Sequence, residues 1–160
     1  MTIRPLHPQD LPAYFSLRTA LWPDSADSFE LEVSEILSNP HLASFVAEQN
    51  RQLVGFVEVS LRDYAEGCDS RPVGYLEGWY VSPEHRRAGI GRKLVQAAED
   101  WARSKGCTEM ASDAELHNTQ SQQAHRRLGY EEVERIVCFR KSLGGANRGS
   151  GEGNYRGSRG

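Results

Sequence analysis

The chain has 160 residues, of which 38% are hydrophobic and 26% charged, a balance typical of a globular protein that buries its own core. No apolar run approaches the ~20 residues of a membrane-spanning helix, and the first residues lack a signal-peptide pattern, so we expect a cytoplasmic protein without membrane contact. The net charge is −3, and residues 144–160 contribute +2 (three arginines, one glutamate), which leaves −5 for residues 1–143. Such an acidic body disfavours nucleic acid as a partner and suits a cationic small molecule.

The cysteines and the C-terminal residues indicate which cross-links and which domain boundary to expect. Cys68, Cys107 and Cys138 are odd in number and lack CxxC spacing, so neither a disulfide framework nor a metal site is expected. Residues 1–143 are expected to form one domain. Residues 144–160 hold seven glycines and are predicted to be a flexible Gly/Arg/Ser-rich tail. A nucleic-acid arm is the alternative, and Tyr155 is the only aromatic residue that would support it.

The first elements follow from periodicity. Residues 2–6 are predicted to form a strand, and the following helix ends at Trp22-Pro23. A second helix is predicted over residues 28–38. The residues expected to face inward from the two helices are Leu11, Tyr14, Leu17 and Leu21, then Phe29, Val33, Ile36 and Leu37.

The middle of the chain alternates between strands and helices. Residues 42–47 and 53–61 predict a hairpin, residues 73–81 another strand, and residues 91–105 an amphipathic helix closed by Gly106. A fifth strand is predicted over 108–113, then a helix over 119–128 capped by Asn118, then two closing strands over 130–133 and 136–141. Helices between strands, with an early hairpin, indicate a mixed α/β sheet.

A basic loop with glycines connects the strand at 73–81 to the helix that follows. The first turn of a helix has unpaired N–H groups and the positive end of the helix dipole, and glycines allow an anion to approach closely. Arg86, Gly89 and Gly91 stand at this position, which predicts a phosphate-binding site. The loop has neither the P-loop ending nor the GxGxxG spacing of a dinucleotide fold.

The pattern Arg86-x-x-Gly89-x-Gly91 after a strand resembles the acetyl-CoA signature of the GNAT acetyltransferases. This resemblance implies a mixed, mostly antiparallel sheet with a central splay, flanked by about four helices, and acetyl-CoA as co-substrate. It also implies that backbone groups of Trp79, Tyr80 and Val81 bind the pantetheine arm, with Asn118 further along it. The implied pyrophosphate ligands are Arg86, Arg87, Ala88, Gly89, Ile90 and Gly91.

His125 departs from the GNAT pattern. The segment Ala124-His125-Arg126-Arg127-Leu128-Gly129-Tyr130 is similar to the family segment in which a tyrosine protonates the departing thiolate, and here His125 replaces that tyrosine. A histidine can serve as a general acid near neutral pH, and a packed or solvated helix residue is the alternative.

Within the family, the chain resembles the aminoglycoside 6'-N-acetyltransferases, which confer antibiotic resistance. Runs that carry this resemblance include Leu21-Trp22-Pro23, Leu76-Glu77-Gly78 and Glu109-Met110-Ala111-Ser112-Asp113. The resemblance implies a homodimer that uses the last strands. It also implies that acids bind the drug amines between aromatic walls; the implied acids are Glu77, Asp113 and Glu134, and the walls are Trp22 and Tyr64.

The chemistry of amine acetylation requires acids in any case. An alkyl amine titrates near pH 10, so on the order of one molecule in a thousand is a free nucleophile at pH 7. A carboxylate that attracts the ammonium group and accepts its proton removes this obstacle, and Glu77 and Asp113 are the candidate catalytic residues. The alternatives are acetylation of a protein, peptide or other small amine, and a CoA-binding domain without turnover.

Overall fold

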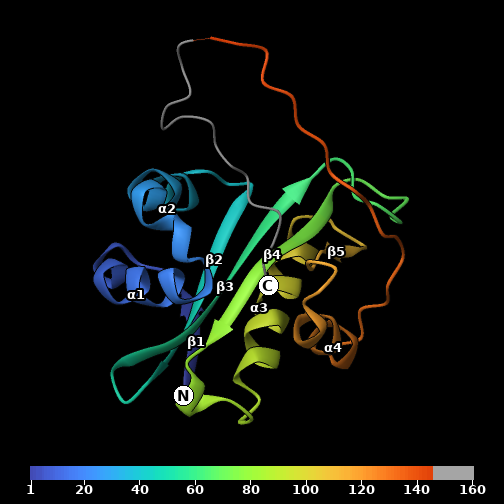
Figure 1. The fold of residues 1–160 in the computed structure, drawn as a ribbon. Coiled ribbons are helices and arrows are strands. Elements are labelled where there is room, and N and C mark those ends of the chain that lie inside the picture. The colour runs from blue at the N-terminus through green and yellow to red at the C-terminus, as the bar shows by residue number, and fades with distance from the viewer. Residues whose placement is uncertain (146–160) are drawn as a thin grey trace.

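The computed structural model describes residues 1–145, so residues 146–160 of the tail predicted at 144–160 lie outside the described residues. Its centre is a five-stranded sheet in which the strands lie side by side in chain order (Figure 1). All neighbours are antiparallel except β4 and β5, which are parallel. The strands are β1 (Thr2–Pro5), β2 (Leu42–Gln49), β3 (Gln52–Arg62), β4 (Val73–Val81) and β5 (Met110–Ser112).

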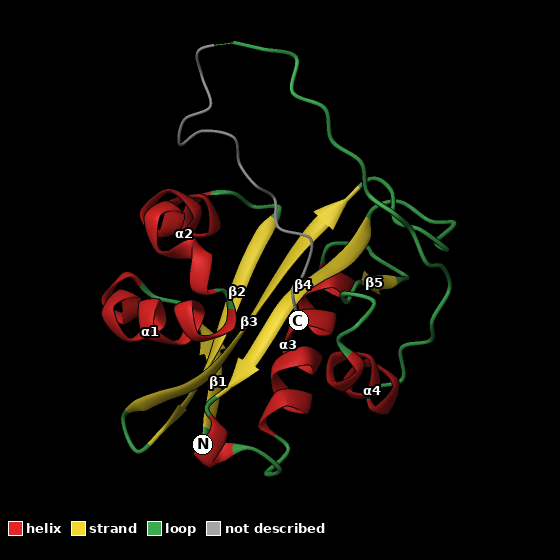
Figure 2. Ribbon diagram, in the orientation of Figure 1, coloured by secondary structure: helices red, strands yellow, loops and turns green. Residues whose placement is uncertain are grey.

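Helices cover both faces of the sheet: α1 and α2 lie on one side, and α3 and α4 on the other (Figures 1 and 2). The α-helices are α1 (Leu11–Leu21), α2 (Phe29–Ser38), α3 (Ile90–Ser104) and α4 (Thr119–Arg127), and short 3₁₀ turns span Pro8–Asp10, Pro23–Ser28 and Pro83–His85. The predicted fold class, a mostly antiparallel mixed sheet with four flanking helices, is confirmed.

Two apolar clusters hold these layers together. One packs α3 against the sheet through residues such as Leu94, Val57 and Leu76. The other packs α1 and α2 on the opposite face through residues such as Tyr14 and Val33. Leu37 was expected in this second cluster and is instead 40% exposed. With Val33 and Phe29 already buried on the inner face of α2, the helical twist turns Leu37 toward solvent.

Local signals account for where the elements end. The β2–β3 hairpin turns through Asn50 and Arg51, both at positive φ (52° and 64°), as expected of a two-residue turn that matches the twist of its strands. Gly106 follows α3 at φ 90°, the left-handed conformation in which glycine ends helices. Asn118 caps α4 by accepting a hydrogen bond from the backbone N–H of Ser121 at 3.0 Å.

A buried ionic group ties the α1 side to the sheet. Glu58 of β3 accepts hydrogen bonds from Tyr14 (2.5 Å) and from Arg18 Nε (2.6 Å). Arg18 also pairs with Glu32 of α2 at 2.5 Å. Glu58 and Arg18 are almost fully buried, so the loss of either one would leave the other as an unpaired buried charge, which is strongly destabilising. This group therefore fixes how α1 and α2 sit on β3.

The two predicted closing strands are not present in the described residues, because residues 130–145 adopt no regular structure. Their apolar side chains are largely exposed, from 59% for Ile136 to 91% for Phe139. An alternating apolar pattern stabilises a strand only where a neighbouring strand pairs with it, and no strand among residues 1–145 pairs with this segment. Among the described residues, no helix has the length and apolar content for a membrane crossing.

Candidate active site

The site lies where β4 and β5 part. The two parallel strands are paired at Gly74, Tyr75 and Leu76 of β4, and the last pair is Leu76 with Ser112. β4 continues to Val81, whereas β5 ends at Ser112. The strands therefore open a gap beyond this pair, and the residues that come next are Glu77 on one strand and Asp113 on the other.

A β-bulge directs Glu77. Opposite β3, Leu76 pairs with Val59 and Gly78 pairs with Glu58, so Glu77 is an extra residue between them. A bulge changes which face a side chain points to, and bulges are frequent beside active sites. Here the bulge brings Glu77 to the face of α1 and α2, the same face as Ser60 of β3, with which it is hydrogen-bonded.

Glu77 is buried at 8% exposure and well supplied with donors. Ser60 donates to its Oε1 at 2.6 Å, and Arg62 Nη2 lies 3.0 and 3.2 Å from the two carboxylate oxygens. An opposite charge at this distance favours the ionised carboxylate.

Asp113 is connected to the same group of residues. The hydroxyl of Tyr75 donates a hydrogen bond to Asp113 Oδ2. Burial, followed by the hydrogen bond to Asp113, raises the pKa of Tyr75 well above its usual value, so Tyr75 keeps its proton. The guanidinium of Arg62 stacks on the Tyr75 ring, with its Cζ 3.4 Å from the ring centroid. The structure thus joins Glu77 and Asp113, which are 36 positions apart in the sequence, through Arg62 and Tyr75.

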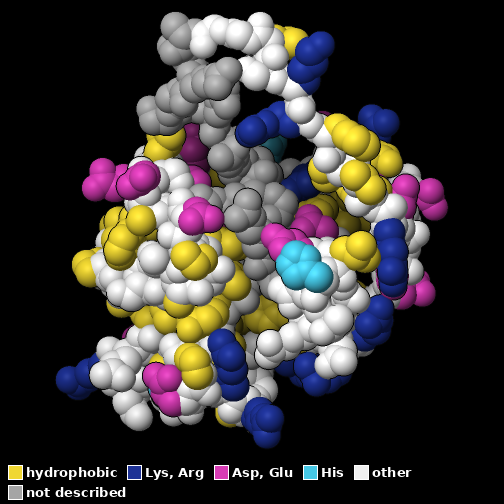
Figure 3. Space-filling model, in the orientation of Figure 1, with side chains coloured by type: hydrophobic (Ala, Val, Ile, Leu, Met, Phe, Trp, Pro, Cys, Tyr) yellow, Lys and Arg dark blue, Asp and Glu magenta, His cyan; other side chains and the backbone are white. Residues whose placement is uncertain are grey.

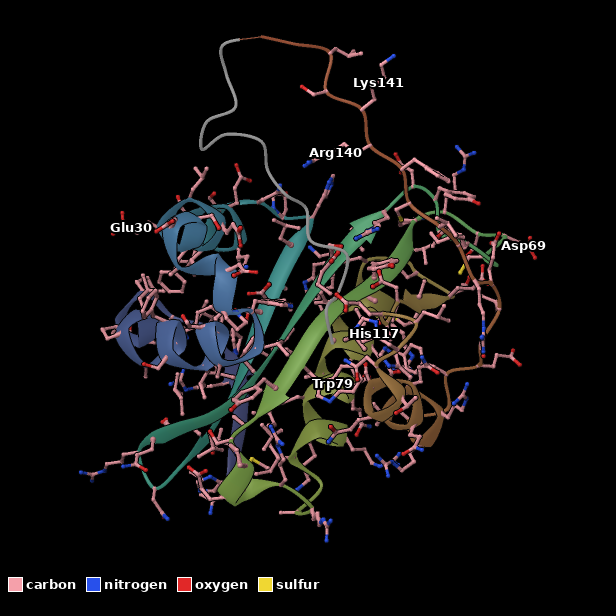
Figure 4. The ribbon with its side chains drawn as sticks, in the orientation of Figure 1. Glu30, Asp69, Trp79, His117, Arg140 and Lys141 are labelled. Carbon is pink, nitrogen blue, oxygen red and sulfur yellow. The ribbon has the colours of Figure 1, made fainter. Side chains whose placement is uncertain are left out.

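His125 stands on the other face of the gap. Its ring packs edge-on against Trp79, with centroids 4.9 Å apart, and its Nε2 lies 2.8 Å from the Ser112 hydroxyl. Trp79 projects from β4 toward α4 (Figure 4). The acids therefore line one side of the opening between β4 and β5, and His125 with Trp79 lines the other.

The protonation of His125 follows from its partners. Its Nδ1 lies 2.7 Å from the carbonyl oxygen of Ser121, which can only accept, so Nδ1 carries the proton. Burial lowers the pKa of His125. A neutral ring protonated at Nδ1 has no proton on Nε2. The Ser112 hydroxyl, 2.8 Å from Nε2, donates its single proton to the carbonyl oxygen of Leu76 at 3.0 Å, so it cannot donate to Nε2 at the same time. His125 as a general acid stays a prediction and requires that the ring first be protonated.

The basic loop forms the start of α3. Gly89 is the residue before the helix and has φ 77°, and a Cβ added there would meet no atom within 4 Å. Arg86 is fixed at the end of β4, because its Nε donates to the carbonyl oxygen of Val81 at 2.8 Å. Backbone N–H groups at the beginning of a 15-residue helix, an open glycine and adjacent arginines fit an anionic phosphate group.

The remaining predicted cofactor ligands are dispersed around this loop. Arg87 and Ala88 are exposed, and Ile90 is buried in the cluster between α3 and the sheet. Gly91 faces the Trp79 ring: a Cβ added to Gly91 would lie 3.4 Å from Trp79 Nε1. Figure 3 shows basic side chains along the lower edge and also in the upper part of this face, and acidic side chains at its centre and at both sides.

The other predicted substrate residues differ in where they lie: Trp22 is buried beside Gly78, the residue after Glu77, whereas Tyr64 and Glu134 are exposed. Trp22 is only 3% exposed and packs on Gly78 and Phe56 inside the core. Tyr64 lies in the loop before β4 at 68% exposure, and Glu134 lies in the exposed segment after α4. Figure 4 shows that segment, with Arg140 and Lys141, extending away from the helices. Trp22, Tyr64 and Glu134 stay predictions as substrate contacts.

Three residues that contact Glu77 or Asp113 were not predicted from the sequence as part of the site: Ser60, Arg62 and Tyr75. Ser60 and Arg62 are two positions apart near the end of β3, so a strand pattern places both on one face. A basic residue on the same face as Glu77 was the available signal. Its pairing depends on the register between β3 and β4, which includes the bulge and could not be read from the sequence.

Comparison with known proteins agrees with this geometry. The chain matches the Acetyltransferase (GNAT) family over residues 9–130. It is 46% identical over 144 residues to the aminoglycoside N(6')-acetyltransferase type 1 of Stenotrophomonas maltophilia, covering 89% of this chain and 94% of the relative. The protein of the same description from Klebsiella aerogenes is 44% identical over 146 residues, with 88% and 96% covered.

Solved structures give the same result. The structure of AAC(6')-Iy in complex with the bisubstrate analogue CoA-S-monomethyl-acetylneamine superposes with a TM-score of 0.85 at 42% identity and covers 88% of this chain and 97% of its own. AAC(6')-Ig from Acinetobacter haemolyticus superposes with a TM-score of 0.87 at 39% identity, covering 90% and 100%. The family match over residues 9–130 and these relatives establish that the chain belongs to the GNAT family of acetyltransferases.

Proposed function

We propose that the protein is an acetyl-CoA-dependent aminoglycoside 6'-N-acetyltransferase that confers resistance to these antibiotics. The observation that carries this proposal is the position of Glu77 and Asp113, which are the first residues after Leu76 and Ser112, the last pair between β4 and β5. A cationic substrate is attracted there, and relatives that are 40–46% identical bear the same activity in their names.

In this proposal each face of the gap has its own task. Acetyl-CoA supplies the acetyl group, held by the loop from Arg86 to Gly91, by backbone groups of Trp79, Tyr80 and Val81, and by Asn118. The acids hold the drug's ammonium groups and accept the proton that the amine must lose before it attacks. The drug amine attacks acetyl-CoA directly within a ternary complex, so no acetyl group is carried on the protein.

The division of labour between the acids is also part of the proposal. Glu77 is the principal base, because its strand also aligns the pantetheine arm, and Asp113 mainly orients the drug. Glu134, Trp22 and Tyr64 complete the drug site in this assignment, and His125 is its candidate general acid for protonation of the thiolate.

The decisive experiment measures CoA release from acetyl-CoA across a panel of amines. We expect turnover with kanamycin-type 6'-amino aminoglycosides, and none with an analogue that has a hydroxyl group at the 6' position. Faster turnover of peptide N-termini or lysine side chains would favour a protein acetyltransferase instead. Tight acetyl-CoA binding without CoA release for any amine would identify a CoA-binding domain without activity.

We further propose a cytoplasmic homodimer that acts on a small cationic substrate and not on nucleic acid. The support for the dimer is the exposed apolar segment after α4, which includes Val137 at 77% exposure. In a dimer, residues around 136–141 can pair with a strand edge of the second copy, which would bury these side chains.

A further inference from the structure

Arg62 belongs neither to the predicted phosphate-binding loop nor to the pair of acids, and no role has been assigned to it so far. It is the last residue of β3. Its side chain is 29% exposed, so most of it is covered by neighbouring residues and not by water. On one side it contacts both oxygens of Glu77, and on the other its guanidinium stacks on Tyr75. Tyr75 in turn donates to Asp113.

This arrangement answers an electrostatic problem. A carboxylate at 8% exposure is costly to ionise, and a protonated Glu77 could neither attract an ammonium group nor accept its proton. Ser60 supplies a hydrogen bond but no charge. Among the described residues, Asp113 lies on the same side and would disfavour ionisation of Glu77, and the charge of Glu58 is already matched by Arg18. Arg62 is a cation in direct contact with Glu77, and its charge balances the carboxylate.

We propose that Arg62 is a positioning residue of the active site, which keeps the buried Glu77 ionised and fixed in direction beside Asp113. The inference rests on the proposed function of these two acids. Arg62 contacts Glu77 directly, and it stacks on the ring of Tyr75, whose hydroxyl donates to Asp113. One guanidinium therefore sets the geometry of both acids. Its planar shape matters, since it pairs with a carboxylate and stacks on an aromatic ring at the same time.

The test compares Arg62→Met and Arg62→Lys with Arg103→Met, a control that removes an exposed arginine of α3 that pairs with Asp100. Initial rates are measured with kanamycin and acetyl-CoA between pH 5.5 and pH 9. In Arg62→Met we expect the acid limb of kcat/KM to move up by about one pH unit, because Glu77 then loses its ionised form at higher pH. The loss of activity should therefore be largest at the acid end of this range and smallest at pH 8.5.

The remaining readouts separate positioning from general damage. Acetyl-CoA affinity by calorimetry should stay within about twofold of wild type, since Arg62 lies on the face away from the phosphate-binding loop. Arg62→Lys should restore most of the acid limb, because it keeps the charge. In a Glu77→Gln background, Arg62→Met should lower kcat/KM by a clearly smaller factor than in the wild type, because the part of its effect that acts through Glu77 is already lost and only the part that acts through Tyr75 and Asp113 remains.

Each outcome decides the matter. An unchanged pH profile in Arg62→Met, an equal loss in Arg103→Met, or an undiminished loss in the Glu77→Gln background would overturn the proposal. Should Arg62→Met unfold, the double variant with Glu77→Gln should regain the wild-type Tm, since the uncompensated charge is gone, and failure to do so would overturn it as well. If Glu77→Gln alone has wild-type rates, the proposed function of the acids fails instead, whatever Arg62 does.

Discussion

Leu76 and Ser112 are the last residues paired between β4 and β5, and the next residue on each strand is an acid. The opening between the strands and the two carboxylates therefore arise from the same local event. β5 ends at Ser112, and a bulge at the neighbouring position of β4 turns Glu77 toward the α1 face. A reaction that joins a cofactor on one face to an amine on the other needs such a passage.

Glu77→Gln and Asp113→Asn test the acids directly. Each should lower kcat/KM for a 6'-amino aminoglycoside by a factor on the order of 10² to 10⁴, the range for a positioned base. Acetyl-CoA affinity should stay near normal, because the cofactor loop is intact. The variants are compared by initial rates from pH 6 to pH 10.

The pattern of the loss distinguishes the two roles. If Glu77 is the base, kcat falls and recovers at high pH, where free amine is plentiful. If a carboxylate only binds the drug, KM rises and kcat stays. Wild-type rates in both variants near pH 7 would refute the placement of the active site.

The phosphate-binding loop is best tested at Gly91. A Cβ at this position would come no closer than 3.4 Å to the Trp79 ring, an ordinary contact, so Gly91→Val should leave the fold intact. Gly89→Val is less informative, because φ 77° strains any branched residue there. We expect Gly91→Val to abolish measurable acetyl-CoA binding by calorimetry, since its side chain would occupy the space of the pyrophosphate. Normal affinity in a folded Gly91→Val protein would contradict the assignment.

Elements with a clear apolar period could be read from the sequence. The strand expected at 73–81 matches β4, and the helix expected from 28 to 38 matches α2 within one residue, because burial on one face leaves a regular pattern. The stretches at 130–133 and 136–141 have the alternation of strands but form none in the described residues. Alternation reports a suitable surface, and only the fold or a second chain supplies the partner.

The site was readable only in part, for a related reason. Glu77 and Asp113 could be singled out by the chemistry of amines and by resemblance. Their connection through Arg62 and Tyr75 depends on a one-residue bulge and on where β5 stops, and both are set by tertiary packing. Trp22, predicted as a wall of the drug site, is 3% exposed in the structure, and its ring packs where Gly78 has no side chain.

The contact between Gly78 and Trp22 predicts a stability effect. A Cβ on Gly78 would lie 2.6 Å from Trp22 Cζ2, so Gly78→Ala forces the indole to move. We expect a loss of about 1–3 kcal/mol in the free energy of unfolding, the usual cost of overpacking a core. Urea unfolding measures it, with Gly91→Ala as the control at a position that has room. The double variant with Trp22→Phe should recover part of the loss, and strict additivity would show that the two residues do not clash.

His125 makes stability depend on pH in a defined direction. Burial lowers its pKa in the folded state, so the unfolded chain binds a proton at His125 more readily than the folded chain does. Below the usual histidine value of about 6.5, this difference favours unfolding, and above it the effect vanishes. We expect His125→Gln to have a smaller fall in Tm between pH 7.5 and pH 5.5 than wild type. His117→Gln is the control, because His117 is 84% exposed. Equal falls in the three proteins would contradict this assignment.

The segment after α4 supplies the last prediction. Phe139 is 91% exposed and Val137 is 77% exposed, a pattern that water disfavours and that a second copy of the chain can relieve. Light scattering at micromolar concentration should therefore report about twice the 17.9 kDa of one chain. Phe139→Asp should shift the protein toward monomer, because a charge is costly to bury in such an interface. Arg140→Asp, at the adjacent exposed position, changes charge without removing apolar area and should keep the dimer. A monomer mass for the unmodified protein, or the same dimer in Phe139→Asp, would show that this segment does not join two chains.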